Sequence, residues 1–464
     1  MMLTRWATIL LQLLVVAQAF SPLSIPTRYH AATNKKISWT DASTINSQSL
    51  ALTATTAPTT EQTFGASDGE DPKSYSDILQ NLQQQGFQLM GIDATDVTAF
   101  LAAVWQILAD MSASDEAQSI GLIFENSDIP VSALASLEQD WAALQQEQDG
   151  RLMPHLPEVA RLNVRVARGT VQPNDRTQLT DPVNGKPTLL LEARARTDAE
   201  KEERESRQIF ETVFTEEKTT AAMQHFVTRL VQQNSPGATC PYTASATVSG
   251  VGLEARGVQP GPVGYRYDGT SDAVQAVSAF WACVQECLAT KDEDLATILL
   301  SLPAIGPGMD GHDRFAAVVE LISRNLCLFR GDGVFGLVHF HPGYKRDTIH
   351  PVDKPAYGHL PPTSWLRPML RHNNHVKEAE SMTEKDLACS DYQRRAPCTM
   401  INILRASQLD AAAGPKSIVD LQIDPTRTEK ASGIVTYTRN AIRLASLGEN
   451  TLRDALEEEM VSML

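Results

Sequence analysis

The sequence predicts an α/β protein. The prediction depends mainly on residues 216–464, where we expect a small, mostly parallel sheet flanked by helices. Three apolar runs of strand length alternate there with two helical patterns; the runs are 263–267, 295–302 and 334–341. The helical patterns, 273–289 and 314–326, are long enough to bring the chain back across a sheet, and such crossovers place consecutive strands in parallel. Ser271 and Asp272 can cap the first helix.

The N-terminal half, residues 67–215, is predicted to be mainly helical with a few strands. Apolar residues spaced three and four apart form amphipathic segments through residues 75–147. Strand candidates at 162–166 and 189–194 surround a loop rich in Pro, Asn, Gly and Asp. No internal repeat and no chemical motif is evident in this half, so the sequence assigns it no function.

Composition and charge exclude several classes of function. The chain has 464 residues, with 40 Lys and Arg against 56 Asp and Glu, giving a formal net charge of −16. Such an acidic balance argues against a nucleic-acid partner, because phosphate neutralisation requires clustered Lys and Arg. After the N-terminus no apolar run approaches the roughly 20 residues of a membrane span. Six cysteines are too few for a disulfide scaffold.

The N-terminus has the pattern of a targeting signal. Arg5 precedes an apolar stretch, and Ala17-Gln18-Ala19 has the small residues of a cleavage site, so residues 1–19 are predicted to be a signal peptide. Residues 20–66 are predicted to be a transit peptide and linker, rich in Ser and Thr and poor in acidic residues. With Phe20 after the cleavage site, the segment resembles the bipartite presequence of algae with complex plastids. The resemblance implies the plastid stroma, reached through the secretory pathway; the alternative is secretion.

Three motifs in the C-terminal half occur in a fixed order. They are Cys240-Pro241-Tyr242, Phe340-His341-Pro342-Gly343-Tyr344, and Arg394-Arg395-Ala396-Pro397 followed by Ile401-Asn402-Ile403-Leu404-Arg405. Together they resemble domain-of-unknown-function family 1415 over roughly residues 218–445. Asn402 stands where the family usually shows His, Thr399 stands where it shows Pro, and residues 346–388 are an insertion. The resemblance implies an α/β domain but no established activity, and a lost catalytic His would leave this copy inactive.

Cys240 and His341 are the candidate catalytic pair. A thiolate can attack a carbonyl carbon when a nearby His takes its proton. Both residues are expected in loops at the edge of one sheet, where they could converge. The alternative is that Cys240 packs as a small apolar residue and that His341 hydrogen-bonds the turn begun by Pro342.

Arg395 and Arg405 are the candidate binding residues for an anionic small molecule. Arg binds carboxylate or phosphate in a bidentate manner, and Pro397 is expected to precede a helix N-terminus that favours anions. Tyr344 and Tyr392 could add hydroxyl hydrogen bonds in the same pocket. Alternatively, both arginines pair with acidic side chains and both tyrosines simply pack.

A histidine-rich stretch raises the question of a metal site. Its members are His339, His341, His350, His359, His372 and His375. Most of them lie in or beside the insertion, where ligands essential to a family would not be expected. We therefore predict no metal site and leave any cofactor unknown.

Two classes of function remain open. The first is an enzyme or binder acting on an anionic small molecule through Cys240, His341 and the arginines. The second is a non-catalytic binding or scaffolding protein that retains the fold, and its protein partners are unknown. The strand ending at His341 is expected inside the sheet, and the insertion is expected to loop outwards as a lid. Deleting residues 350–385 should then leave the domain folded, and His341→Ala or Arg395→Ala should abolish ligand binding with little loss of stability.

Overall fold

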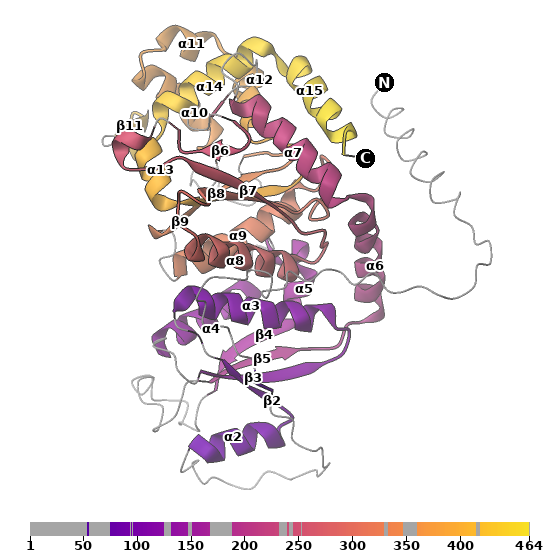
Figure 1. The fold of residues 1–464 in the computed structure, drawn as a ribbon. Coiled ribbons are helices and arrows are strands. Elements are labelled where there is room, and N and C mark those ends of the chain that lie inside the picture. Colours follow the sequence, from indigo (N-terminus) through magenta and orange to yellow (C-terminus); the bar gives the residue numbers. More distant parts are fainter. Residues whose placement is uncertain are drawn as a thin grey trace, which may run out of the picture. The chain divides into compact units, whose positions relative to one another are not determined.

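The computed structural model describes residues 53–54, 75–92, 94, 96–124, 131–146, 151–167, 188–231, 239–240, 245–251, 253–328, 333–346, 360–413 and 418–463 (Figure 1). The signal peptide expected at residues 1–19 lies outside these ranges. So does the transit segment expected at 20–66, apart from strand β1 (Thr53–Ala54). Both assignments therefore stay predictions.

The N-terminal half contains a five-stranded sheet with the order β1-β2-β3-β5-β4. Its further strands are β2 (Gln88–Ile92), β3 (Gln118–Phe124), β4 (Leu162–Val166) and β5 (Thr188–Ala193). Its helices are α2 (Tyr75–Gln84), α3 (Val97–Ala113), α4 (Val131–Gln145), α5 (Pro157–Ala160) and α6 (Asp198–Val213), with a 3₁₀ turn at Met153–His155. The expected helices and the two expected strands are present. The description of this half as mainly helical with a few strands is confirmed, and β2 and β3 are strands that the sequence did not predict.

The C-terminal half contains a second five-stranded sheet, β6-β7-β8-β10-β9. Its strands are β6 (Val248–Ser249), β7 (Gly261–Tyr267), β8 (Thr297–Ser301), β9 (Phe335–Phe340) and β10 (Met400–Arg405). The helices before and between them are α7 (Glu216–Val231), α8 (Ala273–Ala289) and α9 (His312–Leu328), with a 3₁₀ turn at Glu254–Arg256. The predicted α/β class is confirmed.

Pairing within the second sheet is mixed rather than mostly parallel. Among the described strands, β7 and β8 pair in parallel, whereas β10 pairs antiparallel with both β8 and β9. The crossovers through α8 and α9 do give β7, β8 and β9 one direction, as expected. However, β10 inserts between β8 and β9, so the strand that leads to His341 is an edge strand, and its expected place inside the sheet is wrong.

The two sheets have the same topology. In each, a short first strand pairs antiparallel with the second, the second and third pair in parallel around a helix, and the last strand inserts antiparallel between the third and fourth. A helix precedes the second strand of each sheet, α2 before β2 and α7 before β7, and another follows each third strand. The chain therefore contains an internal repeat that relates its two halves, which the sequence analysis did not find.

One hydrophobic core joins the two halves. Alternate residues of a strand point to opposite faces of a sheet. Leu189 and Leu191 of β5 enter the shared core with α3, whereas Leu190 between them packs on the α2 side. Likewise, Leu300 of β8 enters the shared core with α8, whereas Leu299 packs on the α7 side. Helices α3 and α8 thus lie between the two sheets (Figure 1).

The insertion is partly an ordered helical subdomain. Its described residues form α10 (Thr363–His372), α11 (Val376–Ser381) and α12 (Glu384–Ala388), followed by a 3₁₀ turn at Cys389–Gln393. Trp365 and Leu370 of α10 are buried in one cluster with Leu421 and Ile434. The predicted outward lid is therefore wrong for residues 360–388, and the rest of that prediction, at 347–359, lies outside the described residues.

The C-terminal segment covers this subdomain. It consists of α13 (Ala406–Ala413), β11 (Val419–Asp424), β12 (Arg427–Ala431), α14 (Ile434–Leu447) and α15 (Glu449–Val461).

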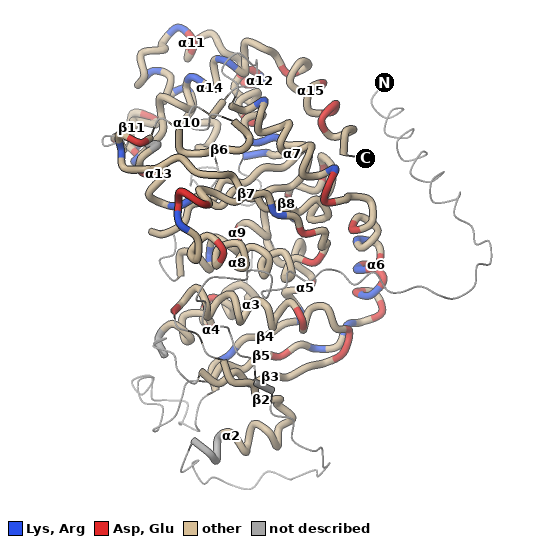
Figure 2. The backbone as a smooth tube through the Cα atoms, viewed as in Figure 1, with Lys and Arg blue, Asp and Glu red and all other residues tan. Residues whose placement is uncertain are grey.

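Figure 2 shows charged residues crowded along α6. Within the described part of the chain, no helix is both long and apolar enough to cross a bilayer.

Candidate functional site

His341 lies in the tight turn that follows β9 and is fully buried. The His341 carbonyl accepts the Tyr344 N–H at 3.0 Å, which closes the turn around Pro342 and Gly343. The ring crosses to the loop after β8, where Nε2 donates to the Gly306 carbonyl at 2.7 Å, and Nδ1 accepts the Gly343 N–H at 2.9 Å. One face of the ring stacks on Phe315, with centroids 5.7 Å apart.

These contacts make His341 unsuitable as a general base. A carbonyl can only accept and an N–H can only donate, so the ring is neutral and carries its proton on Nε2. Burial, followed by the nearby His312 ring, lowers the pKa of His341 to about 3. Its one lone pair is already occupied by Gly343, and none is left to accept a proton from the Cys240 thiol. The geometry supports the structural alternative for His341.

Tyr344, Tyr392 and Arg395 do come together. The Arg395 Nε donates to the Tyr344 carbonyl at 3.3 Å, and the guanidinium lies over the Tyr392 ring, 4.1 Å from its centroid. Tyr344 is fully buried, and its hydroxyl accepts the Leu360 N–H at 3.0 Å. Arg395 therefore reaches the turn at His341, as the sequence predicts.

Arg405 lies at the other end of β10. Met400 pairs with Phe340, beside His341, whereas Arg405 pairs with Phe335, about 17 Å along the strand. Its guanidinium binds the carbonyls at the C-terminus of α8, including that of Cys287 at 2.7 Å, and pairs with Asp292. The predicted pairing of Arg395 with Arg405 at one anion site is wrong. So is the expected helix N-terminus after Pro397, because residues 400–405 form a strand.

Cys240 is half-buried beside α7. Its side chain packs against an apolar cluster that includes Phe226 and Phe340, and its backbone N–H donates to the Leu230 carbonyl at 3.1 Å. This packing matches the alternative that Cys240 serves as a small apolar residue.

Arg394 is the residue that sequence reasoning missed. It is only 8% exposed, and its guanidinium lies over the Phe340 ring at 5.6 Å. Its Nη1 is buried without a hydrogen bond, and no carboxylate among the described residues forms an ion pair with it. The sequence shows the pair Arg394-Arg395, but it does not show which of the two arginines is buried without an ion partner.

The residue before Arg394 belongs to a polar cluster. The Asn440 amide donates both to the Gln393 Oε1 at 3.0 Å and to the Thr239 carbonyl at 3.1 Å. Arg394 follows Gln393 in the chain, and Cys240 follows Thr239. Asn440 therefore joins the segments that carry Arg394 and Cys240. The exposed Arg439 donates to the same Thr239 carbonyl at 3.3 Å. We call Thr239, Gln393, Arg394, Arg439 and Asn440 the arginine corner.

The histidine-rich stretch does not form a group of metal-binding side chains in the described residues. Within the described ranges, no three His, Cys, Asp or Glu side chains are grouped so that they could hold a metal ion. His350 and His359 lie outside those ranges. His312, His339 and His341 instead form aromatic contacts with Phe315 and Tyr344.

Comparison with known proteins gives no relative. No protein-family model matches the chain, and no curated protein or solved structure is significantly similar to it. The resemblance to family 1415 therefore stays a prediction from the three motifs.

Proposed function

We propose that the C-terminal half binds an anionic small molecule at the arginine corner. The observation that carries the proposal is the buried guanidinium of Arg394, which no carboxylate among the described residues neutralises. A buried charge without an ion partner costs several kcal/mol in a protein interior. The Phe340 ring offsets part of that cost, since cation–π contacts contribute about 1–2 kcal/mol. A bound carboxylate or phosphate would offset the rest.

The surrounding groups suit such a ligand. Arg439 adds a second positive charge beside the Thr239 carbonyl, and its side chain is exposed. Arg394 can bind two oxygens of a carboxylate or phosphate in parallel, which gives orientation as well as affinity. Because His341 cannot serve as a base for Cys240, the geometry favours a binding role over thiol catalysis by that pair.

A stability assay on three full-length proteins tests the proposal. Arg394→Met removes the charge and keeps the length of the side chain. Arg324→Met is the matched control, because Arg324 pairs with Asp140 at 3.0 Å. Melting temperature is measured in sodium chloride, inorganic phosphate and citrate at equal ionic strength. Phosphate and citrate stabilise most proteins through solvent exclusion, so the control variant measures that background.

Two results together are expected. Wild type and Arg324→Met gain more in phosphate or citrate than Arg394→Met does, because only they keep the site. In sodium chloride alone, Arg394→Met melts no lower than wild type, because an unpaired buried charge has been replaced by an apolar chain. Equal anion-dependent shifts in all three proteins would overturn the proposal. An Arg394→Met protein that melts several degrees lower than wild type in chloride would show that the guanidinium stabilises the fold without a ligand.

A further inference from the structure

Helices α3 and α8 are equivalent members of the internal repeat. Each has 17 residues and is capped by an aspartate, Asp96 or Asp272, whose carboxylate accepts two backbone N–H groups of the first turn. Each has an extended residue, Ser114 or Thr290, at its C-cap. Trp105 follows Asp96 by the same number of residues as Trp281 follows Asp272.

The two helices pack against each other in antiparallel orientation. The Ser112 hydroxyl, near the end of α3, donates to the cap Asp272 of α8 at 2.7 Å. Further along, the Ser278 hydroxyl of α8 lies 3.4 Å from the Gln106 Oε1 of α3. Between the helices, Trp105 and Trp281 are both almost fully buried.

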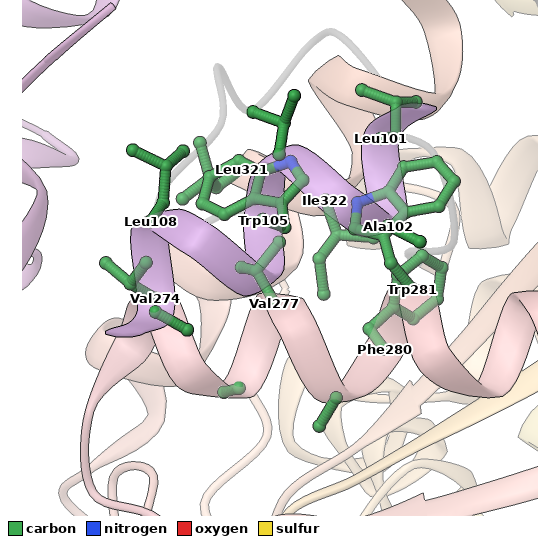
Figure 3. Close-up of a cluster of buried hydrophobic side chains, with 14 of the residues drawn as sticks. Leu101, Ala102, Trp105, Leu108, Val274, Val277, Phe280, Trp281, Leu321 and Ile322 are labelled. Atoms are coloured by element: carbon green, nitrogen blue, oxygen red, sulfur yellow. The ribbon is translucent and has the colours of Figure 1, made fainter. Parts of the chain in front are cut away.

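One apolar contact between the helices recurs with the partners exchanged. Figure 3 shows Trp105 of α3 beside Val277 of α8, and Trp281 of α8 beside Leu101 of α3. Leu101 holds in α3 the position that Val277 holds in α8, counted from the aspartate caps. The two contacts are therefore one contact seen from either side. Ala102, labelled beside this contact in Figure 3, and its equivalent Ser278, which meets Gln106 of α3, are both buried.

We propose that this face of α8 is a self-complementary pairing surface, and that the N-terminal half occupies the place of a second copy of the C-terminal half. A contact that recurs with the partners exchanged is expected where two equivalent helices are related by a two-fold axis. The repeated sheet topology gives the same relation at the level of the fold. The natural partner of the α8 face is then another α8 face, and in the intact chain α3 covers it. This inference is independent of the proposed anion site.

The test disrupts α3 in the full-length chain. Ala102→Glu places a carboxylate in the apolar contact, which should release α3 from α8. The freed α8 faces of two chains should then pair, so the molar mass measured by light scattering doubles relative to wild type. The double variant Ala102→Glu/Ser278→Glu is the control, because it also blocks α8–α8 pairing and should stay monomeric.

Cross-linking keeps the test decisive if the variant aggregates. Residues on the paired faces lie close to the two-fold axis, so Ser278→Cys, added to Ala102→Glu, should be joined to its own copy by a short bismaleimide. Leu288→Cys, exposed near the end of α8 and far from the axis, should not be joined in this way. Peptide mass analysis distinguishes these cross-links from any made by native cysteines. A monomeric Ala102→Glu protein, or an aggregate in which 278–278 and 288–288 cross-links form equally, would overturn the proposal.

Discussion

The buried His341 ring makes the stability of the chain depend on pH in one direction. Its pKa is about 3 in the folded chain, against an ordinary value of 6.5, because burial penalises the charged ring. Above pH 6.5 the ring is neutral in both states, and its contribution to stability is fully present. Between pH 6.5 and about 3 the unfolded chain takes up a proton that the folded chain refuses, so stability falls as the pH falls. One pKa unit corresponds to about 1.4 kcal/mol, so the full loss from this ring is about 4–5 kcal/mol.

The variant His341→Gln separates this effect from general acid denaturation. It removes the titrating ring and breaks hydrogen bonds to Gly306 and Gly343, so at pH 7 we expect a loss of about 2–4 kcal/mol. Urea unfolding is measured from pH 7 to pH 4 for wild type, His341→Gln and the control His372→Gln, whose side chain is exposed. The stability of the variant should fall less steeply with pH than that of the other two. His312, whose pKa burial lowers to about 4, contributes in the same direction to all three proteins.

Parallel slopes for all three proteins would refute the reasoning, because the His341 ring would then titrate in the folded chain as it does when unfolded. A His341→Gln protein as stable as wild type at pH 7 would show that the ring hydrogen bonds contribute nothing. That second result would restore the expectation, drawn from the sequence alone, that replacing His341 costs little stability.

Two further predictions concern packing. Deleting residues 363–388 removes α10–α12 and exposes the apolar side chains of Leu421 and Ile434, so circular dichroism and limited proteolysis should show an unfolded C-terminal half rather than a shortened, folded one. Gly343→Ala would place a Cβ 1.7 Å from the Met309 carbonyl oxygen, and urea unfolding should show a loss of about 3 kcal/mol, whereas Gly333→Ala, whose Cβ meets nothing within 4 Å, should change stability by less than about 0.5 kcal/mol.

Long amphipathic helices and fully apolar strands were predictable from the sequence. The helix after Asp272 and the apolar strands around it have the periodicities that the structure confirms. Strands β2 and β3 were missed because the residues around them have the apolar spacing of helices. A helix was expected after Pro397, whereas residues 400–405 form a strand. Pairing with β8 on one side and β9 on the other stabilises that strand.

The repeat escaped notice because few residue identities survive in it. Within α3 and α8 the recognisable matches are the aspartate cap, the central alanine and the tryptophan, while most other positions differ. Many apolar residues can fill one core position, so a topology can be kept while the sequence diverges.

Arg394 was not predicted as a site residue for a different reason. Whether an arginine is neutralised depends on contacts between distant segments, and a sequence does not show them.

The three motifs read separately in the sequence meet in the folded chain through the backbone. The His341 N–H donates to the Arg394 carbonyl at 3.0 Å, and Arg395 donates to the Tyr344 carbonyl, which ties the second motif to the third. The Asn440 amide then ties the third motif to the residue before Cys240.

This arrangement gives His341 a physical role without catalysis. Its ring fixes the turn after β9 to the loop after β8, and its backbone N–H holds Arg394, which forms no ion pair with a carboxylate of the described residues. A loss of the ring should therefore loosen the arginine corner as well as lower stability. On the proposed function, the buried histidine of this motif serves to position Arg394. This role does not require His341 to gain or lose a proton.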